Sequence, residues 1–569
     1  MLRRAVVVWS LLALAGLSPL ASGFAQPAAP AATPHVRQGA TPVAAQPLPL
    51  AEKQRVEFAA FVAVSLAKLG VPGAAVAVVQ DGQVVFLEGY GVREAGKPAR
   101  VTPDTLMEIG SITKPLTSLM AATLVDDGLL SWDTPVVDLL PTFAVADPAL
   151  TRRLTLDDLL CHCSGLPNRD ETVFWNADRL DPAGLISSLA ETKATAAPGE
   201  RLQYSNQLYS VAGYAAAAAA GAAPDDLLAG YRLAMRERVL GPIGMKRSTF
   251  DTAEVLASGD YALPHAADLD GRATTLSLLR QQRLLSAVDP AAGLWSSGRE
   301  VAAFLETLLT GGVAPDGTPV VSQARLEEVW ARRVTFPKDL SAVLGAEGYG
   351  LGWFTGEERG MRVLSHSGST PGFVSELALL PEANLGLAVL TNGGPGAATF
   401  AFAVRHRLSE ILLEEPVEAA SDVATGAAAA KASLAGLRAL LGALDPAAVT
   451  PYVGRYTNPT LGEVRLTLED GRLIFDAGEI RSTLRPLRTR PNPDVHYVFS
   501  DPGALGSGTQ VILRHDAAGR SELVLGTPAI LADPALSADG FSPYVFTRSD
   551  EPVATPASIP EPSEATPTA

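Results

Sequence analysis

Two cysteines are all that this chain of 569 residues contains, and they stand only two positions apart. A disulfide between residues so close would be strained, so we expect neither a bond between Cys161 and Cys163 nor a disulfide framework. The tripeptide Cys161-His162-Cys163 is also a poor metal site, because three ligands in consecutive residues cannot easily converge on one ion. We therefore expect this segment to be structural.

Positive charge is scarce as well. The chain has 45 Lys and Arg against 61 Asp and Glu, for a net charge of −16. Such a surface repels nucleic acid and anionic lipid, so neither is an expected partner. Hydrophobic residues nevertheless make up 47 % of the chain, which indicates a globular protein with a large core and room for two or three domains.

Long apolar runs are missing beyond the start of the chain. There, a basic beginning and an apolar stretch over residues 5–17 precede small residues at Gly23 and Ala25, with cleavage expected before Gln26. We expect residues 1–25 to be a signal peptide, which implies a secreted or periplasmic protein with no membrane span after cleavage. An uncleaved anchor is the alternative.

Composition divides the remaining chain into segments. Helical periodicity and two hairpin patterns over residues 51–414 predict an α+β domain, in which helices flank an antiparallel sheet with a helical subdomain. Short alternating strands over residues 451–548 predict a separate all-β small barrel. The remaining segments are an Ala- and Pro-rich leader (26–50), an Ala-rich linker (415–450) and a disordered tail (549–569).

The first candidate for chemistry is Ser111-Ile112-Thr113-Lys114, at the start of an apolar helical segment. A spacing of three places Ser111 and Lys114 on one helical face, one turn apart. A serine nucleophile needs a nearby base, and a lysine can serve if its surroundings lower its pKa. A second copy of this pattern, Ser65 to Lys68, lies inside a helical segment where no free backbone N–H groups are available. We expect it to be a chance match.

Two further motifs support Ser111. Tyr204-Ser205-Asn206 begins a helical stretch; a phenol beside a lysine can shuttle protons, and an adjacent amide can bind substrate. A decoy of this motif, Tyr456 to Asn458, lies in the β module. The third motif is a run of small residues around a histidine, before the strand at Phe373: His366-Ser367-Gly368-Ser369.

The order of these motifs resembles the serine β-lactamase and penicillin-binding protein superfamily. The closest resemblance is to the class C β-lactamases, the D-Ala-D-Ala carboxypeptidases and related esterases and D-aminopeptidases, and it covers about residues 50–413. Two departures stand out: cysteines flank His162 where threonines are usual, and His366 begins the third motif in place of lysine. The start of the β module, Tyr452 to Tyr456, resembles a lipocalin-like appendage of some members.

The resemblance implies acyl transfer to Ser111, with Lys114 and Tyr204 handling the protons. Asn206 and His366, with Gly368 and Ser369, would hold a small-molecule or peptide substrate, and the N–H groups of Ser111 and Ser369 would form the oxyanion hole. No metal or organic cofactor is implied. Since every such residue precedes the linker, we expect the β module to be dispensable for the chemical step.

Two rival functions remain open from the sequence. An α/β-hydrolase with a Ser-His-Asp triad predicts a Gly-x-Ser-x-Gly elbow, and the chain has none. A catalytically silent protein that binds peptidoglycan or β-lactams would share the fold, but all three motifs are intact here. The substrate, whether β-lactam, D-amino-acid peptide or ester, is not determined by the fold.

Overall fold

The protein is described here by a computed structural model that covers residues 47–549, except 178–179, 279–284, 359, 460, 479, 489–494, 504–508 and 527–543. The expected signal peptide, most of the leader and most of the tail lie outside the described residues.

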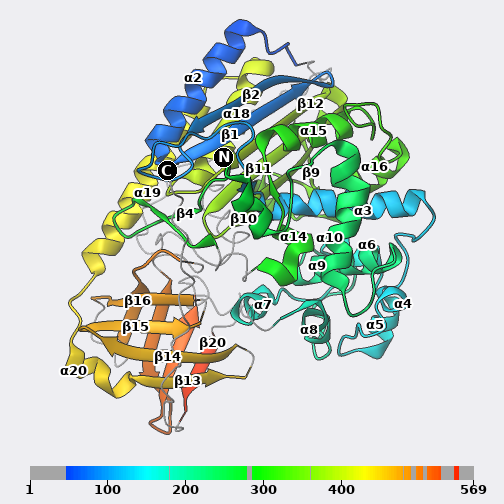
Figure 1. The fold of residues 1–569 in the computed structure, drawn as a ribbon. Coiled ribbons are helices and arrows are strands. Elements are labelled where there is room, and N and C mark those ends of the chain that lie inside the picture. The colour runs from blue at the N-terminus through cyan, green and yellow to red at the C-terminus, as the bar shows by residue number, and fades with distance from the viewer. Residues whose placement is uncertain are drawn as a thin grey trace, which may run out of the picture.

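An eight-stranded antiparallel sheet forms the centre of the α+β domain (Figure 1). Its order, β2-β1-β12-β11-β10-β9-β8-β7, brings the first and last hairpins of the domain side by side. Both hairpins form where the sequence predicts them, and Asp81 and Gly82 take the left-handed conformation that an Asp-Gly turn favours. The strands are β1 (Gly73–Gln80), β2 (Gln83–Gly91), β7 (Val334–Thr335), β8 (Gly348–Tyr349), β9 (Phe354–Glu358), β10 (Met361–Thr370), β11 (Phe373–Leu380) and β12 (Leu385–Thr391).

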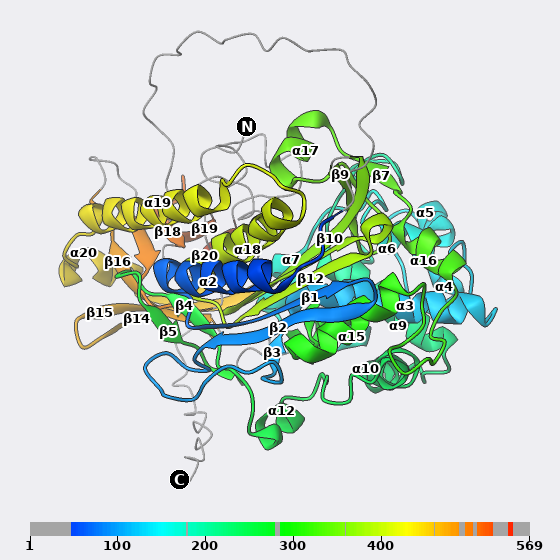
Figure 2. The same ribbon diagram turned by 90° about the horizontal axis from the view of Figure 1, so that it is seen from above.

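Helices cover both faces of this sheet, as the strand β1 shows. All its residues are buried, because alternate side chains point into two different cores. Ala74, Val76 and Val78 pack against the helices α2 (Glu52–Leu69) and α18 (Ala397–Leu412) on one face. Ala75 and Ala77 face the larger core on the other side, where α15 (Gly298–Leu309) lies. A three-layer arrangement results, with helices seen above and below the sheet in Figure 2.

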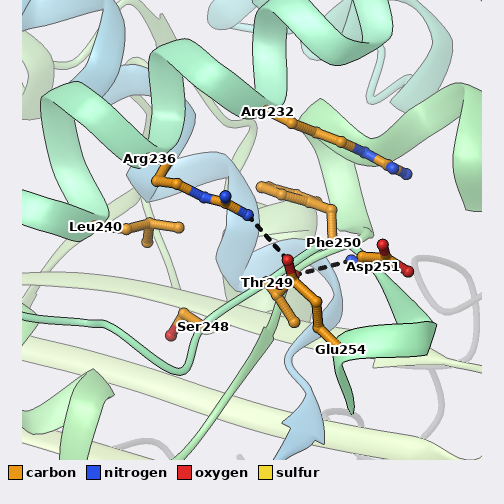
Figure 3. A pocket seen from close by; sticks show the side chains of 8 residues that line it. All are labelled: Arg232, Arg236, Leu240, Ser248, Thr249, Phe250, Asp251 and Glu254. Atoms are coloured by element: carbon orange, nitrogen blue, oxygen red, sulfur yellow. Dashed lines mark hydrogen bonds and ion pairs between the residues drawn. The ribbon is translucent and has the colours of Figure 1, made fainter. Parts of the chain in front are cut away.

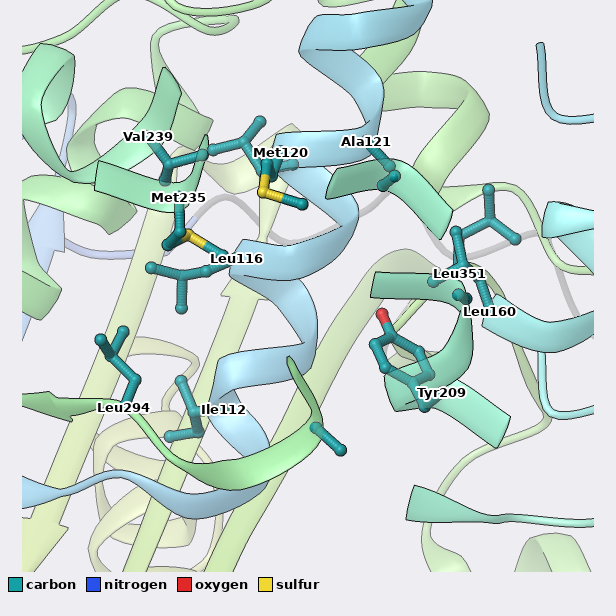
Figure 4. Close-up of a cluster of buried hydrophobic side chains, with 14 of the residues drawn as sticks. Ile112, Leu116, Met120, Ala121, Leu160, Tyr209, Met235, Val239, Leu294 and Leu351 are labelled. Atoms are coloured by element: carbon teal, nitrogen blue, oxygen red, sulfur yellow. The ribbon is translucent and has the colours of Figure 1, made fainter. Parts of the chain in front are cut away.

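The helix α3 (Thr113–Asp126) runs through the middle of the larger core. Its residues from Thr113 to Leu124 are all buried, so it is enclosed by protein on every side. Figure 4 shows its side chains packed between two groups of neighbours, with Met235 and Val239 on one side and Tyr209 on the other. This burial fixes the first turn of α3, where Lys114 lies.

A helical subdomain packs beside α3 and the sheet. Its longest members are α9 (Asn206–Ala219) and α10 (Leu227–Met235), both in contact with α3. Short elements complete it and the surrounding surface: β3 (Met107–Glu108), α4 (Val136–Leu139), α5 (Pro148–Arg153), α6 (Leu156–Leu160), α7 (Asp170–Trp175), α8 (Pro182–Ser187), η3 (Arg236–Leu240), α11 (Gly241–Ile243), α12 (Thr252–Ser258), β4 (His265–Ala267), β5 (Ala273–Thr275), η4 (Ser286–Val288), α14 (Asp289–Ala292), β6 (Trp295–Ser296), α16 (Gln323–Trp330), α17 (Lys338–Leu344) and η5 (Pro381–Ala383).

The segment expected to be a linker contains a long helix, α19 (Ala419–Leu440), followed by the short α20 (Pro446–Val449) and η6 (Thr450–Tyr452). Alanine has the highest helix propensity, and the ten alanines of α19 favour a helix even without a strong amphipathic pattern. Val423 joins the core between α2 and α18, so α19 is docked on the α+β domain and is not a free tether.

The C-terminal module is a closed barrel of eight antiparallel strands, in which β13 pairs with both β14 and β20. Closure removes the exposed strand edges of an open sheet. Alternate side chains such as Val464, Leu466 and Phe475 fill its interior. The strands are β13 (Gly454–Asn458), β14 (Gly462–Glu469), β15 (Arg472–Ala477), β16 (Ile480–Pro486), β17 (Val495–Phe499), β18 (Gln510–His515), β19 (Ser521–Gly526) and β20 (Tyr544–Arg548).

The predicted fold class is therefore confirmed: helices around an antiparallel sheet, followed by a small barrel. No helix within the described residues is both long and apolar enough to cross a bilayer.

Candidate active site

Ser111 lies in a single 3-10 turn, η2 (Gly110–Ile112), that leads directly into α3. The turn begins at Gly110, whose φ of +54° lies in the left-handed region that side chains disfavour. Ser111 itself is half-buried, while Ile112 and Thr113 after it are buried. The sequence placed this serine at a helix start, and the structure does the same.

The start of η2 touches the end of β10 closely. A Cβ on Gly110 would lie 2.7 Å from the backbone nitrogen of Ser369, and a Cβ on Gly368 would lie 2.0 Å from the carbonyl oxygen of Ile109. Ser375 adds a hydrogen bond of 2.7 Å to the same Ile109 carbonyl. Both glycines are thus needed for close backbone approach. Gly368, which the resemblance assigns to substrate binding, thus also has a packing role.

The end of β10 offers an edge next to Ser111. The strand β9 pairs with β10 only from Met361 to Ser365, whereas β11 pairs with it as far as Thr370. Within the described residues no strand covers the second edge at Ser367 and Ser369. The backbone of Ser369 therefore stands beside η2, as an oxyanion hole shared with Ser111 would require.

The ammonium of Lys114 is buried and makes three contacts. Its Nζ lies 3.0 Å from Ser111 Oγ, 2.6 Å from Asn206 Oδ1 and 3.0 Å from the carbonyl oxygen of Ala291. Burial lowers the pKa of Lys114 from 10.5 to about 7, and the negative charge of Asp170 opposes this shift. A neutral amine is therefore accessible near neutral pH.

The partners of Lys114 determine where its lone pair points when it is neutral. An amide oxygen and a carbonyl oxygen can only accept, so Asn206 and Ala291 take both remaining N–H groups. The lone pair is then left facing the hydroxyl of Ser111. This arrangement is that of a general base beside a nucleophile.

Tyr204 completes the group around Ser111. Ser111 is close enough to the Tyr204 hydroxyl to lower its pKa as a side-chain hydrogen-bond partner, and the ring centroid of Tyr204 lies 4.7 Å from Lys114 Nζ. Burial raises the pKa of Tyr204 far above its usual value, so the phenol stays protonated. The raised pKa of Tyr204 fits a proton donor, and the lowered pKa of Lys114 fits a base.

Asn206 bridges Lys114 to a carboxylate that no sequence motif marks. Its Oδ1 accepts from Lys114, and its Nδ2 donates to Asp170 Oδ2 over 2.8 Å. The charges of the two neighbours dictate this orientation of the amide. The sequence predicts that Asn206 binds a substrate amide. In the structure its Oδ1 and one N–H of its Nδ2 already bond to Lys114 and Asp170.

Asp170 stands at the start of α7 and is buried. Besides Asn206 Nδ2 it accepts from the backbone N–H groups of Asn206 (3.0 Å) and Gln207 (3.1 Å) and from the side chains of Asn168 (3.2 Å) and Ser205 (3.4 Å). Burial raises its pKa, but every partner donates to it, which favours the ionised carboxylate. No motif marks Asp170 in the sequence; only tertiary contact reveals it.

His366 does not present a free N–H to the site. Its Nδ1 donates to the carbonyl of Ser367 over 2.7 Å, so its Nε2 accepts from the hydroxyl of Tyr349 over 2.9 Å. Burial and the nearby charge of Lys114 lower the pKa of His366 to about 3, so the ring is neutral. The expected hydrogen bond from His366 to a substrate carboxylate is therefore not available in this arrangement.

The cysteine prediction was wrong: Cys161 and Cys163 form a disulfide, with Cα atoms 5.2 Å apart. His162 between them has a φ of +54°, and this left-handed turn brings the two side chains together. Its ring lies 4.1 Å from the ring of Tyr204, and its Nδ1 accepts from the backbone N–H of Ser205. Burial keeps the His162 pKa well below its usual value, so it supports Tyr204 as a neutral packing group.

Both decoy motifs lie elsewhere. Ser65 is buried in the middle of α2 and Lys68 is exposed, so the two do not form a pair. The Tyr456 hydroxyl donates to the carbonyl of Tyr452 inside the barrel. A third feature, a cavity of about 110 Å³ between α10 and α12, is lined by charges that pair with one another, such as Arg236 with Glu254 (Figure 3). It is separate from Ser111.

Residues 58–410 match the family described as Beta-lactamase, which is more than half of the chain. The chain belongs to the beta-lactamase family. This beta-lactamase family protein is 30 % identical over 341 residues to penicillin-binding protein 4 of Amycolatopsis lactamdurans, covering 60 % of this chain and 86 % of that one. It is 30 % identical over 346 residues to an unguisins hydrolase of Aspergillus campestris, covering 59 % of this chain and 60 % of the relative.

Two solved structures share the fold over most of this beta-lactamase family protein. The octameric penicillin-binding protein homologue from Pyrococcus abyssi matches 87 % of this chain and 99 % of its own, with a TM-score of 0.54 and 21 % identity. The structure of SurE with D-Leu matches 88 % of this chain and all of its own, with a TM-score of 0.50 and 20 % identity. Both matches extend beyond residues 58–410.

Proposed function

We propose that this protein is a serine hydrolase that works through an acyl-enzyme on Ser111. The observation that carries the proposal is the set of contacts around Lys114, where two obligate acceptors direct the lone pair of the neutral amine to Ser111. Membership of a hydrolase family supports it, and the intact site weighs against a silent binding protein.

The proposed reaction has two halves. Ser111 Oγ attacks the substrate carbonyl carbon while its proton passes to Lys114, and the N–H groups of Ser111 and Ser369 stabilise the oxyanion. Tyr204 donates its proton to the leaving amine or alcohol as the acyl bond breaks, and regains a proton from Lys114. Water, deprotonated by the same groups, then hydrolyses the ester on Ser111 and releases the acid.

The test uses the two Ser-x-x-Lys sequences as a matched pair. We expect Ser111→Ala to lose turnover by several powers of ten and to lose labelling by a fluorophosphonate probe. Ser65→Ala, a buried serine remote from the site, should keep both. Equal turnover in wild type and Ser111→Ala, with both proteins folded, would remove the proposal.

For substrates we propose uncharged esters or peptides containing D-amino acids ahead of carboxylate-bearing β-lactams. The neutral His366 supports this, because it supplies no positive charge where a lysine would attract a carboxylate. A panel of nitrocefin, a D-Ala-D-Ala peptide and p-nitrophenyl esters tests the order; nitrocefin leading in kcat/KM would reverse it.

We also propose that the protein is exported to the periplasm or the medium. The basic and apolar start of the sequence supports export, as does the Cys161–Cys163 disulfide, since such bonds persist in oxidising compartments. Fractionation of cells with N-terminal sequencing of the mature protein tests this. A mature protein that begins at Met1 in the cytoplasm would contradict it.

A further inference from the structure

The short helix α7 (Asp170–Trp175) touches the active site at one end and the barrel at the other (Figure 1). Six residues span about 8 Å along a helix axis, so the two ends are near neighbours. A helix this short is not stable alone and depends on what holds its ends.

Trp175, at the C-terminal end of α7, is a member of the apolar core of the barrel. Only 5 % of its surface is exposed, and its ring lies 5.9 Å from Phe475 on β15 and 5.6 Å from Phe546 on β20. A side chain from the α+β domain thus completes the interior of the other domain. Val173 on the same helix packs into the larger core of the α+β domain, so α7 is held from both sides.

Asp170, at the N-terminal end, orders the residues that hold Lys114. Its carboxylate accepts from the Asn206 amide, whose oxygen receives the Lys114 ammonium, and from the backbone at the start of α9. Losing this carboxylate would free the Asn206 side chain to rotate. The lone pair of Lys114 would then no longer be directed at Ser111.

We propose that Asp170 is a positioning residue for Lys114, acting through Asn206, and that the barrel keeps Asp170 in place by holding Trp175 in its core. The inference rests on the proposed function, since it concerns the same Ser111 and Lys114. It also gives the barrel a role in the chemical step, contrary to the expectation that the β module is dispensable.

The charge around Lys114 makes the proposal testable by pH. His162 and His366 beside Lys114 have lowered pKa values, and Tyr204 and Tyr209 have raised ones, so all four are neutral near pH 7. On α14, another helix packed against α3, burial raises the pKa of Asp289 to about 7, and its ion-pair partner Arg232 opposes this shift. Asp170 is therefore the charge that raises the Lys114 pKa.

The first experiment is Asp170→Asn in the full chain, with the pH dependence of kcat/KM measured on a neutral p-nitrophenyl ester. We expect kcat to fall at least tenfold. We also expect the acid limb of the kcat/KM profile to move to lower pH, because the Asp170 carboxylate that favours protonated Lys114 is gone. Asp181→Asn is the control: Asp181 also caps a helix start, on α8, but has no contact with Lys114. An unchanged limb and kcat in Asp170→Asn would overturn the proposal.

The second experiment tests the barrel and does not need Asp170→Asn to fold. Trp175→Ala should lower kcat and move the acid limb in the same direction as Asp170→Asn, and Trp175→Phe should restore both. Trp132→Ala is the matched control, because Trp132 is also buried but donates a hydrogen bond to Glu328, away from α7. If the acid limb of Trp175→Ala lay at the same pH as in the wild type, the proposal that the barrel keeps Asp170 in place would be overturned.

The double variant separates coupling from two unrelated defects. If Trp175 acts through Asp170, Trp175→Ala adds little to Asp170→Asn, whereas independent effects would multiply and contradict the proposal. Ser111→Ala distinguishes the failures. An active Ser111→Ala removes the proposed function itself, while an inactive Ser111→Ala beside normal Asp170 and Trp175 variants removes only this inference.

Discussion

The chemistry proposed here depends on opposite pKa shifts in two adjacent side chains. Burial disfavours charge. It therefore lowers the pKa of Lys114, which becomes a weaker base, and raises the pKa of Tyr204, which becomes a weaker acid. The result is a neutral amine and a protonated phenol on either side of one serine hydroxyl. In water at pH 7 the lysine would be charged, whereas the tyrosine would carry its phenol proton there as well.

A pH profile measures this directly. Below its pKa of about 7, Lys114 is already protonated and cannot accept the proton of Ser111. The kcat/KM on a neutral ester should therefore fall about tenfold for each unit by which the pH is lowered. We expect an acid limb near pH 7, measured between pH 5 and 9. A kcat/KM that does not change with pH between 5 and 9 would show that Lys114 is not the base.

A second prediction concerns Gly110. A methyl group there would meet the backbone nitrogen of Ser369 at 2.7 Å and would strain a φ of +54°. We expect Gly110→Ala to displace Ser111 from Ser369 and to lower kcat/KM by about a hundredfold or more.

Gly128→Ala is the matched control for Gly110→Ala. Gly128 also has a positive φ, of 70°, but a Cβ there meets nothing within 4 Å. The backbone strain then costs about 1 kcal/mol of stability, with activity intact. Similar activity losses in both variants would mean that strain, not the contact with Ser369, is responsible.

At the scale of the elements, the site is assembled from helix starts and one strand end. η2 supplies Ser111, the first turn of α3 supplies Lys114, and the segment before α9 supplies Tyr204, with Ser205 capping α9 through a bond to the N–H of Leu208. Helix starts hold their polar groups in defined directions because their backbone N–H groups need partners. The loop Cys161–Cys163 supports Tyr204 from behind through His162.

The disulfide in that loop should add little to overall stability. Loop-closure entropy for a loop of three residues corresponds to about 1.5 kcal/mol, far less than for a long loop. We expect denaturant unfolding with and without dithiothreitol to differ by about this amount. A difference above about 4 kcal/mol would show that the bond holds more of the fold than its own turn.

At the scale of the whole molecule, two apolar contacts among the described residues join the barrel to the rest of the chain. One is Trp175 in the barrel interior; the other is a small apolar cluster of Leu269, Leu437 and Val498, from the β4–β5 loop, α19 and β17. Arg438 and Asp270 form an ion pair beside that cluster. Two separate contacts restrict the motion of the barrel relative to Ser111.

These contacts change the expectation that the barrel is dispensable. Removal of residues 442–569 would expose Trp175 to water and leave α7 held from one side only. We expect this shortened chain to show red-shifted tryptophan fluorescence and a kcat/KM well below that of the full chain. Full turnover in a folded shortened chain would restore the original expectation.

The sequence by itself determined the fold class and the nucleophile. The Asp-Gly turns, the strand alternation and the helix start before Lys114 are local patterns, set by backbone preferences over a few residues. Ser111 could be separated from Ser65 for the same reason, since one begins a helix and the other lies within one.

Only the tertiary structure decided how the site works. Asp170, the Ala291 carbonyl and Tyr349 reach Lys114 or His366 from segments remote in the chain, and a backbone carbonyl has no sequence signature. The disulfide depended on a left-handed His162 that local preference disfavours. The pKa shifts and the place of Trp175 in the barrel arise from burial, which depends on packing between distant segments, so the local sequence does not encode them.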